Sequence, residues 1–325
     1  MRKFEKVILS RKGFDSASGG GFSPFDPEEG KYIVLPIPMR KQELAINYPL
    51  KYEKIHTKSN HLDGCPETDL KSLMMKSLRI KKATITVKDE ITGKDTKEES
   101  EYAHFDPWLI DCPWLEEDSK HQIGAFGQIG MAQAHLDKQK VGEGSLFLFF
   151  SRFKPIKNRK NKILHDVITS EQHLGGGLYF IYGWLKVKKV IKKYEELRDE
   201  DRLSRHPHAT PAYFNHEDPV KNNTIYIADE FLFNDGSNIR GCGYFPKLSE
   251  DLLLTAPVQK SEKSWIPSRW KMPPGFSFQT CKSIFNKEEK WDTDYLVKTG
   301  WRWQEAVFDL GESQDFCHWF QKLHK

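Results

Sequence analysis

A chain of 325 residues with 38% hydrophobic and 30% charged residues has the composition of a globular protein, which argues against a disordered one. A formal net charge of only +4 excludes a histone-like polycation, and the lack of a long apolar stretch excludes a membrane span. Five scattered cysteines without a C-x-x-C pair argue against a disulfide framework and a zinc knuckle. We therefore expect a cytoplasmic protein without a membrane partner.

The first predicted elements are short buried strands at residues 4–10 and 32–37. A polar loop that is rich in glycine follows the first strand. Residues 80–101 alternate apolar and polar side chains and then become almost wholly charged, which predicts a protruding hairpin or an insertion. Two prolines and alternating polar groups predict an irregular segment at residues 102–114.

The strongest helix signal lies in residues 124–140, where four apolar positions recur at helical spacing. These positions are Ala125, Ile129, Ala132 and Leu136. The later predicted elements are strands at residues 146–153, 178–191 and 223–233 and a short helix at 316–323. No internal repeat and no clear linker divides the chain. We therefore expect one compact, strand-rich domain of mixed α+β class over residues 1–325, with a few packed helices and a charged insertion at about 80–101.

Basic residues gather in three runs, at residues 76–82, 152–162 and 186–193, and two of them flank the predicted strand pair. Such runs are usually solvated faces, but three of them also suit contact with a phosphate backbone. The candidate nucleic-acid-binding residues are Arg152, Lys154, Lys157, Arg159 and Lys160. The expected partner is accordingly DNA, with or without modified bases, or a nucleotide.

The loop after the first strand carries Arg11, Lys12, Phe14 and Asp15. Ligand-binding groups favour strand ends, and the two cations together with glycine amides suit a phosphate group. The spacing of a P-loop is missing. The alternative is a basic turn that is capped by Asp15.

His104 and Asp106 are two residues apart in an extended segment, so their side chains point the same way. They suit an acid–base pair or two ligands of a metal ion, and Trp108 falls on the same side. Gln128 and His135 are seven residues apart, so they lie on one line beside the apolar stripe of the predicted helix and can both face a cleft from its rim. The alternative is that the two polar side chains form a satisfied hydrogen-bond site.

Two further groups stand out near the C-terminal half. His206 and His208 flank a proline and offer two metal ligands, but no third ligand at a diagnostic spacing accompanies them, so we assign no metal ligands and no cofactor. Glu305 follows Gln304 late in the chain and is either a buried carboxylate with a raised pKa or a charge at a strand edge.

Taken in chain order, these motifs resemble the third nucleotide modification associated domain family over nearly the whole chain. The segments that carry the resemblance are VILSRKGFDS with its glycine run, LPIP, His104-x-Asp106-Pro107, GAFGQ with QAHL, LFLFF, YGWLKV, His206-Pro207-His208 and Trp303-Gln304-Glu305. The resemblance implies a place in a bacterial or phage DNA-modification or antiphage system. The two strong strands also resemble the central hairpin of PUA-like domains such as the EVE and ASCH groups, which implies a small β-barrel element with Tyr182 and Trp184 near an aromatic pocket.

Three functions remain open at this point. The first is an enzyme acting on a nucleobase or nucleotide, most simply a glycosylase-like hydrolase of the N-glycosidic bond, although a transferase also fits. The second is a non-catalytic PUA-like reader of modified bases, and the third is a structural subunit. The catalytic candidates are Asp15, His104, Asp106 and His135. The substrate-binding candidates are Arg11, Lys12, Phe14, Trp108, Phe126, Gln128, Trp184 and Gln304. We expect these polar groups to meet in one pocket.

Overall fold

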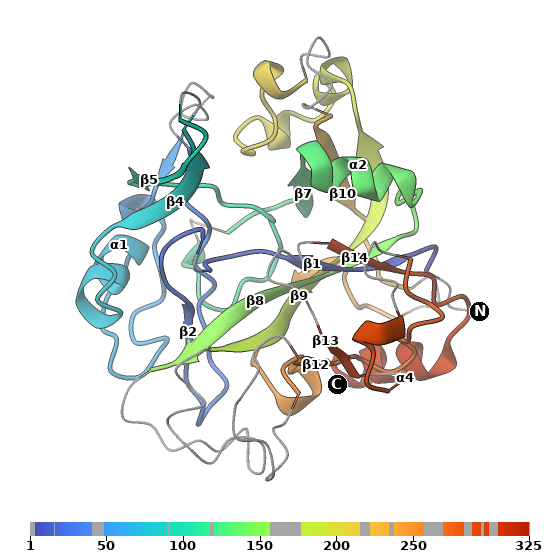
Figure 1. Ribbon diagram of the computed structural model, residues 1–325. Helices are drawn as coiled ribbons and strands as arrows, with labels where there is room; N and C mark the ends of the chain where they lie inside the picture. Colours follow the sequence, from blue (N-terminus) through green and yellow to red (C-terminus); the bar gives the residue numbers. More distant parts are fainter. Residues whose placement is uncertain are drawn as a thin grey trace.

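The central feature of the fold is one large mixed sheet, around which smaller two-stranded sheets and helices are arranged (Figure 1). Its strands lie in the order β14-β1-β8-β9-β10-β7, with β2 beside β8 and β11 beside β9. The bounds of these strands are β1 Val7–Arg11, β2 Ser23–Phe25, β7 Ala125–Gln128, β8 Leu146–Pro155, β9 Leu178–Ile191, β10 Thr224–Ala228, β11 Cys242–Tyr244 and β14 Glu305–Phe308.

A computed structural model describes most of the chain, and every structural statement concerns that part. The described residues are 4–15, 17–40, 49–89, 92–117, 120–156, 177–214, 222–233, 237–256, 269–282, 288–293, 296–298 and 305–324. Among them, no helix combines the length and the apolar character that crossing a membrane requires.

The remaining elements are short. Two-stranded sheets are formed by β3 (Leu50–Lys51) with β6 (Tyr102–Ala103), β4 (Ala83–Lys88) with β5 (Asp95–Ser100), and β12 (Arg269–Lys271) with β13 (Leu296–Lys298). The helices are α1 (Leu70–Ser72), which continues as a π-helical turn at Leu73–Ser77, α2 (Gly130–Lys138) and α4 (Gln314–Lys322). Single 3-10 turns occupy Tyr52–Lys54, Tyr194–Leu197, Asp201–Leu203, Pro211–Tyr213, Glu250–Leu252 and Glu288–Lys290.

Strand pairing brings distant parts of the chain to the same place in the sheet. β1 runs parallel to β8 and antiparallel to β14, with Ser10 opposite Glu305. β10 lies between β9 and β7 and runs antiparallel to both, with Thr224 opposite Gln128. The first and last strands of the chain are therefore neighbours, and the end of β7 lies beside the start of β10.

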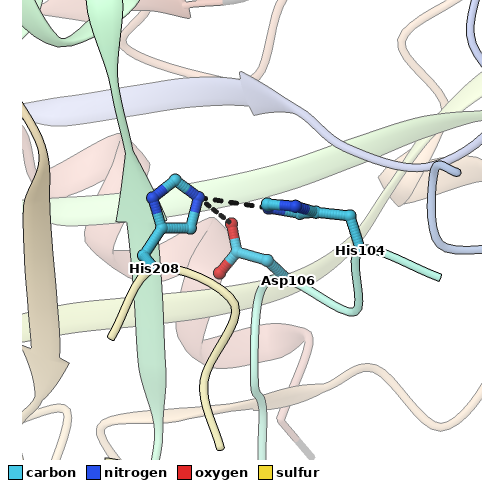
Figure 2. A group of neighbouring side chains, drawn as sticks. All are labelled: His104, Asp106 and His208. Carbon is cyan, nitrogen blue, oxygen red and sulfur yellow. Dashed lines mark hydrogen bonds and ion pairs between the residues drawn. The ribbon is translucent and has the colours of Figure 1, made fainter. Parts of the chain in front are cut away.

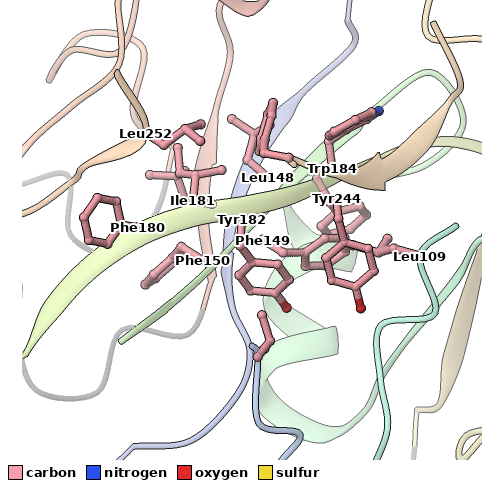
Figure 3. Close-up of a cluster of buried hydrophobic side chains, with 14 of the residues drawn as sticks. Leu109, Leu148, Phe149, Phe150, Phe180, Ile181, Tyr182, Trp184, Tyr244 and Leu252 are labelled. Carbon is pink, nitrogen blue, oxygen red and sulfur yellow. The ribbon is translucent and has the colours of Figure 1, made fainter. Parts of the chain in front are cut away.

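The middle of the sheet is buried on both faces. All but a few residues of β8 and β9 are buried, which is why both strands read as continuous apolar runs in the sequence. The side chains around β9 form a dense aromatic and aliphatic cluster (Figure 3). Trp184 belongs to this cluster: its ring lies 4.8 Å from that of Phe245, and its indole N–H donates to the carbonyl oxygen of Arg240 at 3.0 Å.

The structure confirms the mixed α+β class predicted from the sequence. It also confirms the strands at β8, β9 and β10, the β4–β5 hairpin and helix α4. The described strands form an open sheet and not a closed barrel, so the expected PUA-like barrel element is not found among them. Residues 32–36 are buried, but residues 32–37 form only an isolated bridge, between Phe25 and Tyr32, instead of a strand. Prolines at positions 36 and 38 cannot donate the hydrogen bonds that a longer ladder needs.

The prediction of one helix over residues 124–140 is wrong in its first part. Ala125–Gln128 form strand β7, which pairs with β10, and the helix begins only at Gly130. A short apolar run flanked by glycine is too short for its periodicity to distinguish a strand from a helix. Here the residues form a strand because they pair with the edge of β10. Gln128 and His135 therefore do not share a helix face.

Candidate functional site

The segment after β6 carries His104 and Asp106 to the open edge of β7. Trp108 and Ala125 exchange two backbone hydrogen bonds, of 2.8 and 2.9 Å, which fix this segment against the strand. The N–H of Gly127 then donates to Asp106 Oδ1 at 3.0 Å. The carboxylate is thus held by a backbone amide next to a strand end, and its side chain is only 2% exposed.

The turn with His206 and His208 closes over this carboxylate. His206 Nε2 lies 3.1 Å from Asp106 Oδ1, and His208 Nε2 lies 3.9 Å from Asp106 Oδ2. The Nε2 atoms of His208 and His104 are 3.1 Å apart. Figure 2 shows the His208 ring directed at both His104 and Asp106. We call these four side chains the histidine–aspartate cluster; all of them are buried.

Two neighbours hold His208 in place. Its Nδ1 lies 2.7 Å from Asn223 Oδ1, and Asn223 Nδ2 donates to the His208 carbonyl oxygen at 3.0 Å. On the other side the ring lies directly against the backbone of Gly127, where an added Cβ would come within 2.1 Å of His208 Cγ. Only glycine permits this close approach at position 127.

Burial sets the protonation of the cluster. It lowers the pKa of His104 to about 4 and that of His208 to about 3, so both imidazoles are neutral near pH 7. Burial also acts to raise the pKa of Asp106, but the adjacent His206 and His208 and the charge of Lys12 outweigh it and hold this pKa well below its usual range. The cluster therefore places an ionised carboxylate beside the neutral rings of His104 and His208.

A second buried carboxyl lies on the neighbouring strands. Glu305, at the start of β14, accepts hydrogen bonds at Oε1 from the Ser10 hydroxyl, at 3.0 Å, and from Gln128 Nε2. Lys12 Nζ lies 3.8 Å from the same oxygen and 4.5 Å from the centre of the Phe126 ring. Glu305 Oε2 is buried and has no hydrogen-bond partner among the described residues.

The two carboxyl groups differ in their protonation. Burial raises the pKa of Glu305 to about 7, against the opposing effects of Lys12, Ser10 and Gln128, and the negative charge of Asp106 raises it further. Of the two alternatives that the sequence left open for Glu305, the structure shows the buried carboxyl. Since Lys12 acts on the pKa of both carboxyls, the two groups form one electrostatic unit.

An aromatic wall adjoins the histidine–aspartate cluster. The Trp108 ring stacks on His121, with ring centres 4.4 Å apart, and meets the His206 ring edge-on at 4.8 Å. Burial lowers the pKa of His121 to about 3, so this stack is uncharged near pH 7. His121 carried no signal in the sequence, because a single histidine in a polar loop has no pattern.

Other candidates from the sequence lie elsewhere. Asp15 accepts from the N–H groups of Ala17 and Ser18 and forms an ion pair with Arg11 at 3.0 Å, so both of its oxygens support its own loop. Phe14 is fully buried beneath this loop. His135 is half-buried on α2, and no contact described for it reaches the cluster.

Part of the predicted site falls outside the described residues. Gln304, Lys157, Arg159 and Lys160 all do so. Arg152 and Lys154, at the end of β8, are described: both lie over the Phe22 ring, at 4.8 and 5.7 Å from its centre.

A basic groove lies beside Phe22. It is a cavity of about 1130 Å³, and its cationic lining residues are Lys76, Arg79, Lys81, Lys82, Lys97 and Lys154. The groove thus joins one of the basic runs of the sequence to the β4–β5 hairpin and the end of β8. A second cavity, of about 1290 Å³, lies against α4. Neither of these two cavities is lined by a residue of the histidine–aspartate cluster.

The donor atoms of His104, Asp106 and His208 all lie within 4.8 Å of one another, which is close enough to hold one metal ion. Sequence reasoning noticed both halves of this group but not that they meet. Asn223 and Gly127, which position His208, carried no signal in the sequence.

Comparison with known proteins gave a match to a family model. The family model of nucleotide modification associated domain 3 matches residues 6–309, a range that includes the histidine–aspartate cluster, Lys12 and Glu305. No curated protein and no solved structure matches the chain.

Proposed function

Because the chain belongs to the nucleotide modification associated domain 3 family, we propose that it acts on a nucleobase in a DNA-modification system, as a hydrolase of the N-glycosidic bond. The observation that carries this proposal is Glu305, a buried carboxyl whose pKa is raised to about 7 and whose Oε2 has no partner among the described residues. A carboxyl with these properties holds a proton at neutral pH and can deliver it to a leaving group.

Cleavage of an N-glycosidic bond has three requirements. The departing base takes up a proton, the sugar carbon develops positive charge, and a water molecule attacks that carbon and loses a proton. Glu305 supplies the first proton, and the Asp106 carboxylate stabilises the positive charge. A neutral imidazole of the cluster, His104 or His208, accepts the proton of the water. The base leaves protonated, and the hydroxyl group stays on the sugar.

Binding of a DNA substrate is assigned to the cationic groups. Lys12 lies beside Glu305, and its charge also acts on Asp106, so it suits a phosphate close to the reacting sugar. The basic groove, with Arg152 and Lys154 beside it, suits the phosphates of a longer strand, because six cationic side chains line one depression. The groove supports DNA as the substrate in preference to a free nucleotide.

The alternative of a non-catalytic reader has less support. A reader needs aromatic faces that are open to a base. Trp184, expected on the pocket wall, is 6% exposed and packs against Phe245 and Phe320, while Tyr182 is 1% exposed. These rings belong to the core.

The test is to incubate the purified protein with DNA that carries natural or hypermodified bases and to follow released bases by mass spectrometry. We expect a free base from at least one substrate, with activity falling above about pH 7 as Glu305 loses its proton. Glu305→Gln should abolish this release. Binding without any product, or an altered base that is still attached to its sugar, would contradict the proposal in favour of a reader or a transferase.

A further inference from the structure

The histidine–aspartate cluster has the ligand set of a metal site. Two imidazole nitrogens, the Nε2 atoms of His104 and His208, are 3.1 Å apart, and Asp106 Oδ2 is 3.9 Å from the second. Ligand bonds of about 2.0–2.2 Å to a tetrahedral ion place ligand atoms about 3.3–3.6 Å apart. The donor atoms of the three groups all lie within 4.8 Å of one another, so side-chain movements of about 1 Å let them share one ion.

The hydrogen bonds of Asn223 decide which nitrogen of His208 carries a proton. A carbonyl oxygen only accepts, so the bond to the His208 carbonyl identifies the donating end of the Asn223 amide as Nδ2. The Oδ1 atom, 2.7 Å from His208 Nδ1, is therefore the acceptor, and Nδ1 carries the hydrogen. In the neutral ring, Nε2 then presents a lone pair to the cluster. An outer partner of this kind on the second ring nitrogen is typical of metal-binding histidines.

The Asp106 carboxylate is arranged in the same way. Its Oδ1 accepts from the Gly127 amide and lies against His206 Nε2, so these two neighbours orient the group. Its other oxygen, Oδ2, faces His208 Nε2. Two atoms that both carry lone pairs thus face each other in a buried place, an arrangement that a cation between them stabilises.

We propose that His104, Asp106 and His208 bind one divalent transition-metal ion, through two imidazole nitrogens and one carboxylate oxygen. His104 takes the tautomer with its proton on Nδ1 when the ion is bound. Two histidines and one carboxylate are a ligand set of zinc and of non-haem iron, and with only three protein ligands at least one coordination position stays open for water or substrate. Binding of the ion does not depend on the proposed reaction. With the ion bound, His104 and His208 are its ligands and no longer accept the proton of the attacking water; the ion would instead lower the pKa of that water, so that its proton passes to solvent.

The test is direct metal binding by the full-length protein. The protein is stripped with a chelator and titrated calorimetrically with Zn²⁺, Co²⁺, Mn²⁺ and, without oxygen, Fe²⁺. We expect one equivalent of at least one ion to bind and to raise the melting temperature of the protein. Co²⁺ should show the visible absorption of a site with nitrogen and oxygen ligands. The comparison of Zn²⁺ with Fe²⁺ identifies the preferred metal.

Variants localise the site. His208→Ala and Asp106→Asn should each weaken binding by about 100-fold or more, and Asn223→Ala by about 10-fold to 100-fold, because it orients a ligand. His61→Ala is the matched control, since His61 is a half-buried histidine bonded to the Tyr32 carbonyl and should bind metal as the unaltered protein does. Asp106→Asn retains the shape of the side chain and so guards against a loss of folding.

Two results would overturn the inference. One is that the folded protein binds none of the four ions; the other is that binding survives both His208→Ala and Asp106→Asn. In either case the cluster is a network of protons shared between imidazoles. Metal binding without release of a base would instead refute the proposed hydrolase and leave the metal site standing.

Discussion

The histidine–aspartate cluster and the basic groove are both rich in ionisable side chains, yet they use charge in opposite ways. Within the cluster, Asp106 is buried, and its two oxygens lie against the Gly127 amide, His206 and His208. In the groove, lysines such as Lys76, Lys81 and Lys97 extend from the surface into solvent. Burial therefore lowers the pKa of His104 and His208 in the first region, whereas salt and water screen the charges of the second.

This difference determines what each region can do. A buried carboxylate is fixed in place and its charge acts at full strength, which suits bond-breaking at a single position. Exposed lysines are mobile and interchangeable, which suits a uniform phosphate backbone. One substitution in the cluster should therefore have a large effect, and one in the groove a small and additive effect.

The largest effect is expected for Asp106→Asn. The amide can still accept from the Gly127 N–H, but the negative charge is lost, so the rate of base release should fall by about 100-fold or more. The melting temperature should change little. Asp26→Asn is the matched control, because Asp26 is also buried but accepts from the amides of Glu28 and Glu29 in a separate turn. A large drop in melting temperature with full activity of the folded fraction would make Asp106 a structural residue.

Glu305 should make stability depend on pH. Its pKa is about 7 in the folded protein and lies near the ordinary 4.5 in the unfolded chain, so the folded state holds the proton more tightly. Its contribution is complete below pH 4.5 and is lost as the pH rises through 7. Glu305→Gln removes this dependence. The difference in unfolding free energy between the two proteins should change by roughly 3 kcal/mol between pH 4 and pH 8.

Denaturant unfolding of both proteins across this pH range measures the effect. If the unfolding free energies of the two proteins ran parallel across this pH range, the pKa of Glu305 would be the same in the folded and the unfolded chain, which would contradict the prediction.

Gly127→Ala tests the contact between β7 and His208. The added Cβ would lie 2.1 Å from His208 Cγ, so the ring or the strand must move, at a cost of about 1–3 kcal/mol. Gly142→Ala is the control, because a Cβ at position 142 meets no atom within 4 Å. Denaturant unfolding should show a lower free energy of unfolding for Gly127→Ala and little change for Gly142→Ala. Equal stability of both variants would mean that His208 is free to move aside.

The smallest effect is expected in the groove. Lys81→Ala should weaken DNA binding a few-fold and lower the slope of log affinity against log salt by about one, independently of base sequence. Lys138→Ala, an exposed lysine on α2, should leave the slope unchanged. Equal slopes for Lys81→Ala and the unaltered protein would place the DNA elsewhere on the surface.

The sequence was sufficient for the elements that carry strong local patterns. The apolar runs of β8 and β9 and the helix α4 were predicted within a few residues, because a central strand and an amphipathic helix each leave a distinct spacing of apolar residues. The same reasoning failed at Ala125–Gln128, where four residues are too few to show a period and pairing with β10 selected a strand.

The site shows the same division. Residue type and spacing singled out His104 with Asp106, the pair of His206 and His208, and Glu305 as separate short motifs. Only the tertiary structure joined them: His104 meets His208 across 104 residues, and Glu305 meets Gln128 across 177. Contacts between residues so far apart in the sequence leave no trace in local periodicity, because they depend on strand pairing and on burial. Those two features also decide which carboxyl keeps its proton.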